Sequence, residues 1–542
     1  MLLSHSPCRA AIWPAVLLAA VLPSLPVAAQ SAEAPLAGFD AYVSRAVKDW
    51  DVPGLAVAVV KDDSMVFARG YGVRAIGTRD TVDTHTLFAL GSTTKAFTAL
   101  SAALMVDAGK LRWDGRVASY VPGFVLHDPY VTHEVTLRDL LTHELGFADP
   151  GYMWYGSDQP LAEMVRRLRY LPPESSFRSH FAYNNVGYAT AGWIAGRANR
   201  SSWEDLVRTR ILGPLGMSEV VMTGPELRGK ANVTRPHSYV DDTLRALPAS
   251  SQQLADPIAP AGSMYSNVLD MAKWLRFLLD SGRVNGKRLV SDTAFAEMMR
   301  PQVIVSRDEF YPTAKLTNPN FTAYGLAWFL EDYRGEKVAF HTGSIDGLVA
   351  IVGLMPAKRL GIVVLANRDH AEVRHALMYR VFDSYFGAPR RDWSTEMRAM
   401  YQEARDSAKV AEKKAEAKRV RGTKPSLTPA DYAGNYADSL YGSVNIRLER
   451  GRLVLAPSAF LTADLEHWNY DTFRARYRNR WLGTSMVTFR LAPDGKVSAV
   501  DLENGQVLAR VPTDEAKQQA PSVTKPPTPA APEAPRPSGP SR

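Results

Sequence analysis

The spacing of apolar residues predicts strands at both ends of a long first region and helices between them. Segments 55–60 and 65–71 are apolar and flank a polar turn, which predicts a β-hairpin. Near the far end, apolar patterns predict strands at 324–329, 337–341, 348–354 and 360–365 and a helix at about 371–386. Helical spacing of apolar residues also predicts helices at 92–108, 136–141, 161–168, 187–198 and 268–279. This order predicts an α+β domain over residues 30–390, with an antiparallel sheet flanked by helices and a helical region inserted in its middle.

The pattern changes after residue 390. Residues 391–424 are charged and alanine-rich with few large apolar side chains, which is typical of a solvated helical linker. Alternation resumes over residues 425–512, with turns at Gly451 and Gly495, and predicts a small all-β, barrel-like domain. Residues 513–542 are proline-rich and contain no aromatic residue, so we expect a disordered tail.

The first 29 residues have the composition of a targeting segment. They contain one Arg, no acid, an apolar stretch at Ala15–Leu22 and small residues before Gln30. Because the stretch is shorter than the about 20 residues that span a bilayer, we predict a signal peptide cleaved near Ala29 and a secreted, periplasmic protein without an integral membrane span. An uncleaved anchor is the alternative; a lipoprotein is disfavoured because Cys8 precedes the apolar stretch. Cleavage would remove the only cysteine, which excludes disulfides, cysteine nucleophiles and Cys-ligated zinc.

Composition and charge narrow the class of protein. Of the 542 residues, 46% are hydrophobic and 22% are charged, as in ordinary globular proteins. The net charge is +8, but no basic stripe is interleaved with aromatic residues, so we expect no nucleic-acid partner. The chain lacks Gly-x-Ser-x-Gly, a Walker loop and the His-Glu-x-x-His of zinc proteases, which argues against an α/β-hydrolase, a P-loop enzyme and a zinc protease.

A serine and a lysine three residues apart stand at the start of a predicted helix. The sequence Leu90–Lys95 reads Leu-Gly-Ser-Thr-Thr-Lys, and the spacing places the Lys95 amine over the same helix face as the Ser92 hydroxyl. A nearby amine can remove the hydroxyl proton, and a helix N-terminus favours developing negative charge. Ser92 is therefore a candidate nucleophile with Lys95 as its activator. The alternative is a helix N-cap, and the same Ser-x-x-Lys pattern recurs at Ser522–Lys525 in the predicted tail.

Two further stretches carry suitable groups. Tyr183 and Asn185 stand just ahead of a predicted helix, where the phenol could move protons and the amide could hold a substrate. Tyr-x-Asn also occurs at 265–267 and 477–479, in a predicted packing element and in the β domain respectively. At the end of a predicted strand comes the sequence His341-Thr342-Gly343-Ser344. The Ser344 N–H could join the Ser92 N–H in an oxyanion hole, although His341 could also be an ordinary strand-end residue.

Together and in this order, the three motifs resemble the serine β-lactamase and penicillin-binding-protein superfamily, closest to class C-type enzymes and their esterase and D-aminopeptidase relatives. The resemblance covers about residues 37–386. It implies that Ser92 is acylated, that Lys95 and Tyr183 are catalytic, and that Ser344 contributes its backbone N–H. It also implies that the substrate is bound by Asn185, His341, Thr342 and Gly343. Neither a cofactor nor a metal is expected.

Two departures from the family pattern bear on the substrate. His341 stands where many β-lactamases carry Lys, and His is charged only part of the time near neutral pH, which weakens the case for an efficient β-lactamase. Residues 172–177 replace the usual Pro-Gly turn, so the wall of the site could differ in shape. Loops 146–159 and 306–318 also shape the pocket.

We therefore expect a secreted serine hydrolase that acts through an acyl-enzyme on small esters, amides or D-amino-acid peptides, with peptidoglycan fragments among the candidate partners. Its activity could be that of an esterase, a D-aminopeptidase or carboxypeptidase, or a weak β-lactamase. A non-hydrolytic penicillin- or peptide-binding sensor or scaffold is the alternative. A third interpretation places the function in the β domain, as a ligand carrier; its aromatic residues are more typical of a core.

Overall fold

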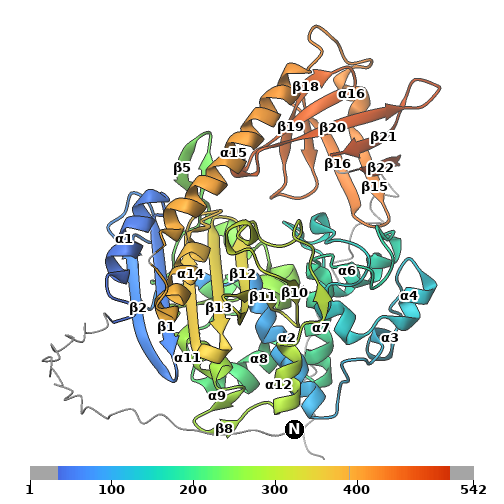
Figure 1. Ribbon diagram of the computed structural model, residues 1–542. Coiled ribbons are helices and arrows are strands. Elements are labelled where there is room, and N and C mark those ends of the chain that lie inside the picture. Colours follow the sequence, from blue (N-terminus) through green and yellow to red (C-terminus); the bar gives the residue numbers. More distant parts are fainter. Residues whose placement is uncertain (1–33, 390, 504, 513–542) are drawn as a thin grey trace, which may run out of the picture.

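The computed structural model describes residues 34–389, 391–503 and 505–512. The predicted signal peptide and the predicted tail lie outside these residues. The described chain forms a helix-flanked antiparallel sheet followed by a closed β-barrel, and a long helix joins the two (Figure 1). The predicted fold class is therefore correct.

The central sheet has eight strands in the order β2-β1-β14-β13-β12-β11-β10-β9. Their bounds are β1 Gly54–Lys61, β2 Ser64–Gly72, β9 Val303–Ile304, β10 Thr322–Tyr324, β11 Phe329–Tyr333, β12 Glu336–Ile345, β13 Leu348–Met355 and β14 Leu360–Ala366. The N-terminal hairpin pairs with β14, so both ends of the domain build one sheet, as the sequence predicts. Short ribbons form from β3 Phe88–Ala89 with β6 Tyr265–Ser266, β4 His237–Val240 with β5 Thr243–Ala246, and β7 Arg283–Val284 with β8 Lys287–Arg288.

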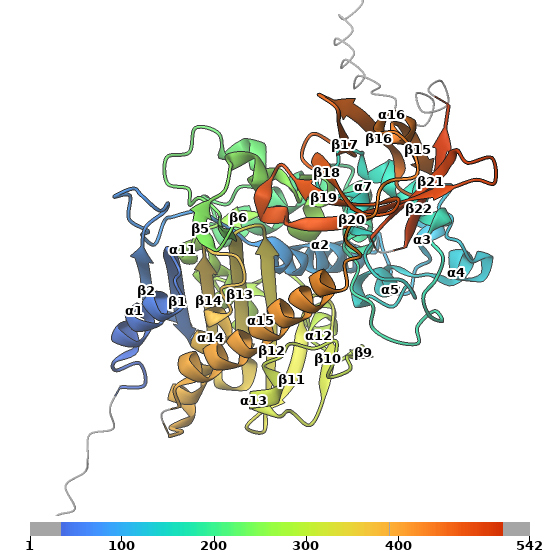
Figure 2. The ribbon, with the colours of Figure 1, turned by 90° about the horizontal axis from the view of Figure 1, so that it is seen from above.

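Helices cover both faces of this sheet (Figure 2). On one face lie α1 (Phe39–Asp49) and α14 (Val373–Phe386), and on the other α11 (Val268–Leu279) and α2 (Lys95–Asp107). The inserted helical region consists of α3 Val117–Tyr120, α4 Pro129–Glu134, α5 Leu137–Thr142, α6 Leu161–Arg167, α7 Asn185–Ala198, α8 Trp203–Val207, α9 Gly213–Leu215 and α10 Ala259–Gly262, and α12 Asp292–Met298 and α13 Ala314–Thr317 follow.

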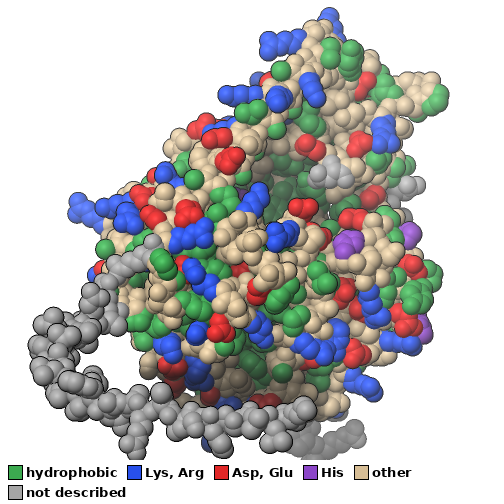
Figure 3. Space-filling model, viewed as in Figure 1, with side chains coloured by type: hydrophobic (Ala, Val, Ile, Leu, Met, Phe, Trp, Pro, Cys, Tyr) green, Lys and Arg blue, Asp and Glu red, His purple; other side chains and the backbone are tan. Residues whose placement is uncertain are grey.

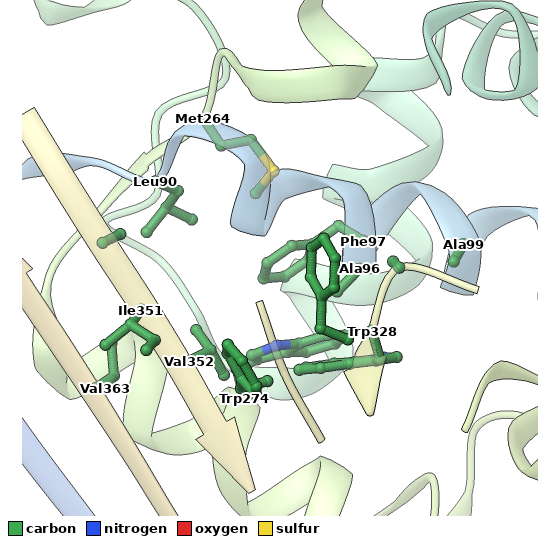
Figure 4. Packing of buried hydrophobic residues seen from close by; sticks show 14 of the residues in the cluster. Leu90, Ala96, Phe97, Ala99, Met264, Trp274, Trp328, Ile351, Val352 and Val363 are labelled. Atoms are coloured by element: carbon green, nitrogen blue, oxygen red, sulfur yellow. The ribbon is translucent and has the colours of Figure 1, made fainter. Parts of the chain in front are cut away.

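Helix α2 is buried almost throughout, which fixes the residues at its start. Phe97 stacks on Trp274 of α11 with ring centroids 4.1 Å apart, and both rings are fully buried. Figure 4 shows Phe97 pointing from α2 toward Trp274 and Trp328. Burial of rings of this size contributes about 1.5–3 kcal/mol each, so the N-terminus of α2 is held on a rigid base.

One predicted strand is wrong. Tyr324 ends β10 and Phe329 begins β11, and residues 325–328 form the turn between them, because Gly325 packs against the Met298 carbonyl and Ala327 adopts a positive φ of 74°. The apolar side chains there are buried, but they belong to a reversal of the chain. The other predicted strands and helices occur with bounds shifted by a few residues.

The second part of the chain is a closed barrel of eight antiparallel strands. Their bounds are β15 Gly434–Asp438, β16 Gly442–Glu449, β17 Arg452–Ala456, β18 Ala463–Asn469, β19 Thr472–Tyr477, β20 Thr484–Leu491, β21 Val497–Leu502 and β22 Gln506–Val511. Helix α15 (Trp393–Ala417) leads to it and α16 (Pro429–Tyr432) precedes its first strand. Most of α15 is exposed, but its N-terminal end buries Trp393 and Met397 against the first domain. Among the described residues, no helix is long and apolar enough to cross a membrane.

Candidate active site

Ser92 lies in a short 3₁₀ turn that leads into α2. The turn spans Gly91–Thr94 and α2 begins at Lys95. Ser92 makes no helix-capping hydrogen bond, so the structure excludes the N-cap alternative for this serine. Lys95 Nζ lies 3.1 Å from Ser92 Oγ, which is hydrogen-bond distance.

The Lys95 amine has three close hydrogen-bond partners, and none of them is a carboxylate. It lies 2.7 Å from Asn185 Oδ1 and 2.9 Å from the Ala261 carbonyl, besides Ser92 Oγ. Lys95 is fully buried, and burial lowers the pKa of its amine to about 7, against an opposing effect of the Asp149 charge. A large fraction of the amine is therefore neutral near pH 7.

These partners fix the direction of proton transfer. Two of them, Asn185 Oδ1 and the Ala261 carbonyl, can only accept hydrogen bonds. A neutral amine has two N–H groups, and both are used by these acceptors. Its lone pair then points at the remaining partner, the Ser92 hydroxyl, and can accept the Ser92 proton.

Tyr183 and Asn185 reach the same amine from the start of α7. Asn184 caps this helix by accepting from the Gly187 N–H. The Asn185 side chain is oriented by Asp149, whose carboxylate accepts from its Nδ2 at 3.0 Å and from its backbone N–H at 2.8 Å. Sequence reasoning missed Asp149, because nothing in the stretch around it indicates that it would meet α7.

Tyr183 is a neutral phenol in this site. Burial raises its pKa well above the ordinary value, and a hydrogen bond with Ser92 offsets only part of that shift. Its ring centroid lies 4.8 Å from Lys95 Nζ. Tyr183 can therefore give a proton to a leaving group, whereas Lys95 is the group that can take one from Ser92.

The imidazole of His341 is also neutral. Burial lowers its pKa to about 3, and the charge of Lys95 acts in the same direction. Its Nδ1 lies 2.6 Å from the Thr342 carbonyl and its Nε2 lies 3.1 Å from the Tyr324 hydroxyl. Both nitrogens thus have partners within the protein, and the site carries no fixed cation at this position. The Thr342 hydroxyl is engaged as well, 2.6 Å from that of Tyr311.

The end of β12 lies directly against the Ser92 turn. A Cβ atom on Gly343 would lie 1.8 Å from the Leu90 carbonyl and 3.0 Å from the Ser92 nitrogen, and one on Gly91 would lie 2.6 Å from the Ser344 nitrogen. Arg374 holds the Gly343 carbonyl at 2.6 Å. Because C=O and N–H point in opposite directions across a trans peptide, the Ser344 N–H points away from Arg374. This arrangement suits an oxyanion hole made by the Ser92 and Ser344 N–H groups.

Gly343→Ala is expected to destabilise the protein by about 1–3 kcal/mol, because its Cβ has no room beside the Leu90 backbone. Thermal denaturation measures the loss. The matched control is Gly151→Ala, where a Cβ meets nothing within 4 Å. Equal melting temperatures for Gly343→Ala and the wild type would contradict this close packing.

A cavity of about 100 Å³ opens beside Ser92. Of the residues predicted from the sequence, Ser92, Asn185 and Ser344 line it. Its wall also includes Trp154, Tyr155 and Asp346, which sequence reasoning missed; the first two lie in loop 146–159, which the sequence indicated only as pocket-shaping.

Residues of the barrel contact the wall of the cavity beside Ser92. The Asp346 carboxylate accepts from the Tyr155 hydroxyl at 2.5 Å and from Trp481 Nε1 of the barrel at 2.7 Å. Phe460 of the barrel packs on Tyr155 with ring centroids 5.8 Å apart. The second domain therefore holds part of the boundary of the candidate active site in place.

Two family profiles match the chain. The family described as Beta-lactamase matches residues 39–384, and the one described as Domain of unknown function (DUF3471) matches residues 418–519. The first match contains every candidate site residue and the second contains the barrel.

Two relatives are similar to this chain in sequence over more than 300 residues each. Unguisins hydrolase ungD from Aspergillus violaceofuscus (strain CBS 115571) is 28% identical over 530 residues, covering 89% of this chain and 92% of that protein. Penicillin-binding protein 4 from Amycolatopsis lactamdurans is 30% identical over 317 residues, covering 58% of this chain and 81% of that protein.

Solved structures share the fold. The octameric penicillin-binding protein homologue from Pyrococcus abyssi aligns with a TM-score of 0.57 at 22% identity, covering 87% of this chain and 99% of that one. The crystal structure of SurE aligns with a TM-score of 0.53 at 19% identity, covering 88% of this chain and 99% of that one.

Proposed function

The chain belongs to the Beta-lactamase family of serine hydrolases, and on that basis we propose that it is a secreted, periplasmic enzyme that forms an acyl-enzyme on Ser92. One observation carries the proposal. A fully buried amine whose pKa lies at about 7 contacts the hydroxyl of Ser92, and its two other partners can only accept hydrogen bonds. This arrangement prepares the serine for attack on a carbonyl carbon.

The reaction proceeds in two steps. Lys95 takes the Ser92 proton while Ser92 Oγ attacks the carbonyl carbon, and the Ser92 and Ser344 N–H groups hold the oxyanion. The bond to the leaving group then breaks, and Tyr183 passes it a proton that Lys95 replaces. In the second step Lys95 takes a proton from a water that attacks the acyl carbon. The bond from that carbon to Ser92 Oγ then breaks, and Lys95 returns the proton to Oγ, which releases the acid and regenerates Ser92.

The substrate is a small ester, an amide or a D-amino-acid peptide, with no efficient β-lactamase activity. Neutral His341 supports this choice, because the carboxylate of a β-lactam would find no fixed positive charge there. The relative named as an unguisins hydrolase matches this chain over both domains, which lends support to a hydrolytic activity.

The substrate class can be tested by measuring kcat/KM for 4-nitrophenyl acetate, a D-amino-acid amide and nitrocefin. We expect turnover of the ester or the amide at a rate at least about 10²-fold above that of nitrocefin, which corresponds to about 2.7 kcal/mol in transition-state binding. A non-hydrolytic binder would be favoured if folded protein hydrolysed none of the three substrates but was still acylated by a labelled penicillin.

The pH dependence of activity is expected to follow Lys95. Its amine acts as a base only when neutral and its pKa is about 7, so kcat/KM should rise as the pH rises through about 7. The charge of Asp149 raises that pKa, and Asp149→Asn should move the midpoint to lower pH while reducing the maximum rate, since Asp149 also orients Asn185.

A pH–rate profile of kcat/KM for the wild type and Asp149→Asn makes this measurement. Asp494→Asn, at an exposed turn of the barrel, is the matched control and should leave the midpoint unchanged. An unchanged midpoint in Asp149→Asn would exclude Lys95 as the titrating base.

A further inference from the structure

The Ser92 cavity adjoins a larger cavity between the two domains. The Ser92 cavity, at about 100 Å³, is smaller than the about 300–1,000 Å³ of ordinary ligand sites. A second cavity of about 540 Å³ shares Trp154 and Tyr155 with it, and we call this second cavity the domain cleft. Much of any substrate larger than a simple ester must therefore lie outside the Ser92 cavity, and the domain cleft is next to it.

Both domains supply the walls of the domain cleft. Tyr152 and Tyr155 come from the first domain, and Tyr441, Tyr477 and Gln506 from the barrel. Four of these five side chains are tyrosines, which offer flat apolar surface together with a hydroxyl. A third cavity of about 250 Å³ continues from the same residues into the barrel. Figure 3 shows the surface hollowed between the upper and lower parts of the molecule.

Acidic side chains predominate on the walls of these cavities. Among the described residues, the walls of the Ser92 cavity and the domain cleft contain three acids, Asp149, Glu174 and Asp346, and no Lys, Arg or His. Glu174 is exposed and lines the domain cleft. The basic residue of the third cavity, Arg167, is paired with Glu163 at 2.6 Å. A carboxylate in the domain cleft would meet like charge and no free counter-charge.

We propose that the domain cleft is a substrate subsite that binds a peptide segment with apolar or aromatic side chains and without a carboxylate. The inference rests on the proposed hydrolase function, because it assigns the non-reacting part of the substrate to a surface beside Ser92. Tyrosine rings bind such a segment through large, rigid contact area, and the acids disfavour anionic competitors. The barrel thus forms part of the substrate site.

Calorimetry on the Ser92→Ala protein measures this binding without turnover. The probes are N-acetylated, C-amidated six-residue peptides of phenylalanine and leucine with one central lysine, glutamine or glutamate, in L and D series. In at least one series we expect the lysine and glutamine peptides to bind at least tenfold tighter than the glutamate peptide. Adding Tyr152→Ala should weaken binding of the glutamine peptide at least fivefold, since this side chain is 39% exposed and lines the domain cleft.

Charge reversal at Glu174 tests the electrostatic part. Glu174→Lys should shift the ratio of glutamate-peptide to lysine-peptide affinity at least fivefold toward glutamate. Glu403→Lys is the matched control, because Glu403 is exposed on α15 and lines none of these cavities, and it should change no affinity. The proposal would be overturned if the three peptides bound with equal affinity or did not bind measurably. It would also be overturned if neither Tyr152→Ala nor Glu174→Lys changed the affinities. If the wild type did not hydrolyse the ester but the peptides bound to Ser92→Ala as expected, only the hydrolase function would be contradicted.

Discussion

Ser92→Ala is expected to reduce kcat/KM for 4-nitrophenyl acetate at least about 10³-fold, or about 4 kcal/mol of transition-state stabilisation. The alanine variant keeps Lys95 and the oxyanion-hole N–H groups but has no atom that can become acylated. Stability should change little, because the Ser92 hydroxyl caps no helix. Steady-state kinetics with a thermal melt of the same sample make the comparison.

Ser119→Ala provides the matched control for this experiment. Ser119 is an exposed serine on the short helix α3, and its replacement should leave both rate and melting temperature at the wild-type values. Substantial turnover in pure Ser92→Ala, with Ser119→Ala unchanged, would mean that another residue attacks the substrate.

Lys95→Met is expected to reduce kcat/KM by about 10²–10⁴-fold, the range that general-base catalysis supplies. Methionine fills a similar volume and has no lone pair on nitrogen to accept the Ser92 proton. The residual activity should also no longer rise as the pH passes through about 7, since that rise comes from the Lys95 amine. A pH–rate profile of the residual activity measures both effects.

Lys95→Arg distinguishes a base from a simple positive charge. Arginine keeps the charge but cannot deprotonate in the accessible pH range, so activity should stay as low as in Lys95→Met. Recovery of most of the activity in Lys95→Arg would show that the positive charge, and not proton transfer, is what the site needs. The control is a thermal melt of each variant, because Lys95 is fully buried and its replacement could unfold the protein.

The sequence predicted the parts of the site that depend on local spacing. Ser92 and Lys95 are three residues apart on one helical turn, and a pair at that distance meets wherever the turn forms. The strands that carry the sheet were also predictable, because the apolar segments at 348–354 and 360–365 are uninterrupted and short. Residues 324–329 are equally apolar, but the turn there depends on the Met298 carbonyl, which is distant in sequence.

The residues that sequence reasoning missed all act through tertiary contacts. Asp149 orients Asn185 across 36 positions of the chain, and Arg374 holds the Gly343 carbonyl across 31. Asp346 meets Trp481 of the barrel across 135 positions. Neither periodicity nor spacing reports such contacts, so the pKa of Lys95 and the neutrality of His341 become visible only when burial is known.

The acylation of Ser92 is tested most directly by mass spectrometry after treatment with a fluorophosphonate. We expect one adduct per chain, located by peptide mapping on Ser92, and no adduct in Ser92→Ala. An adduct on a different residue, or none in wild-type protein shown to be folded, would contradict the assignment of Ser92 as the nucleophile.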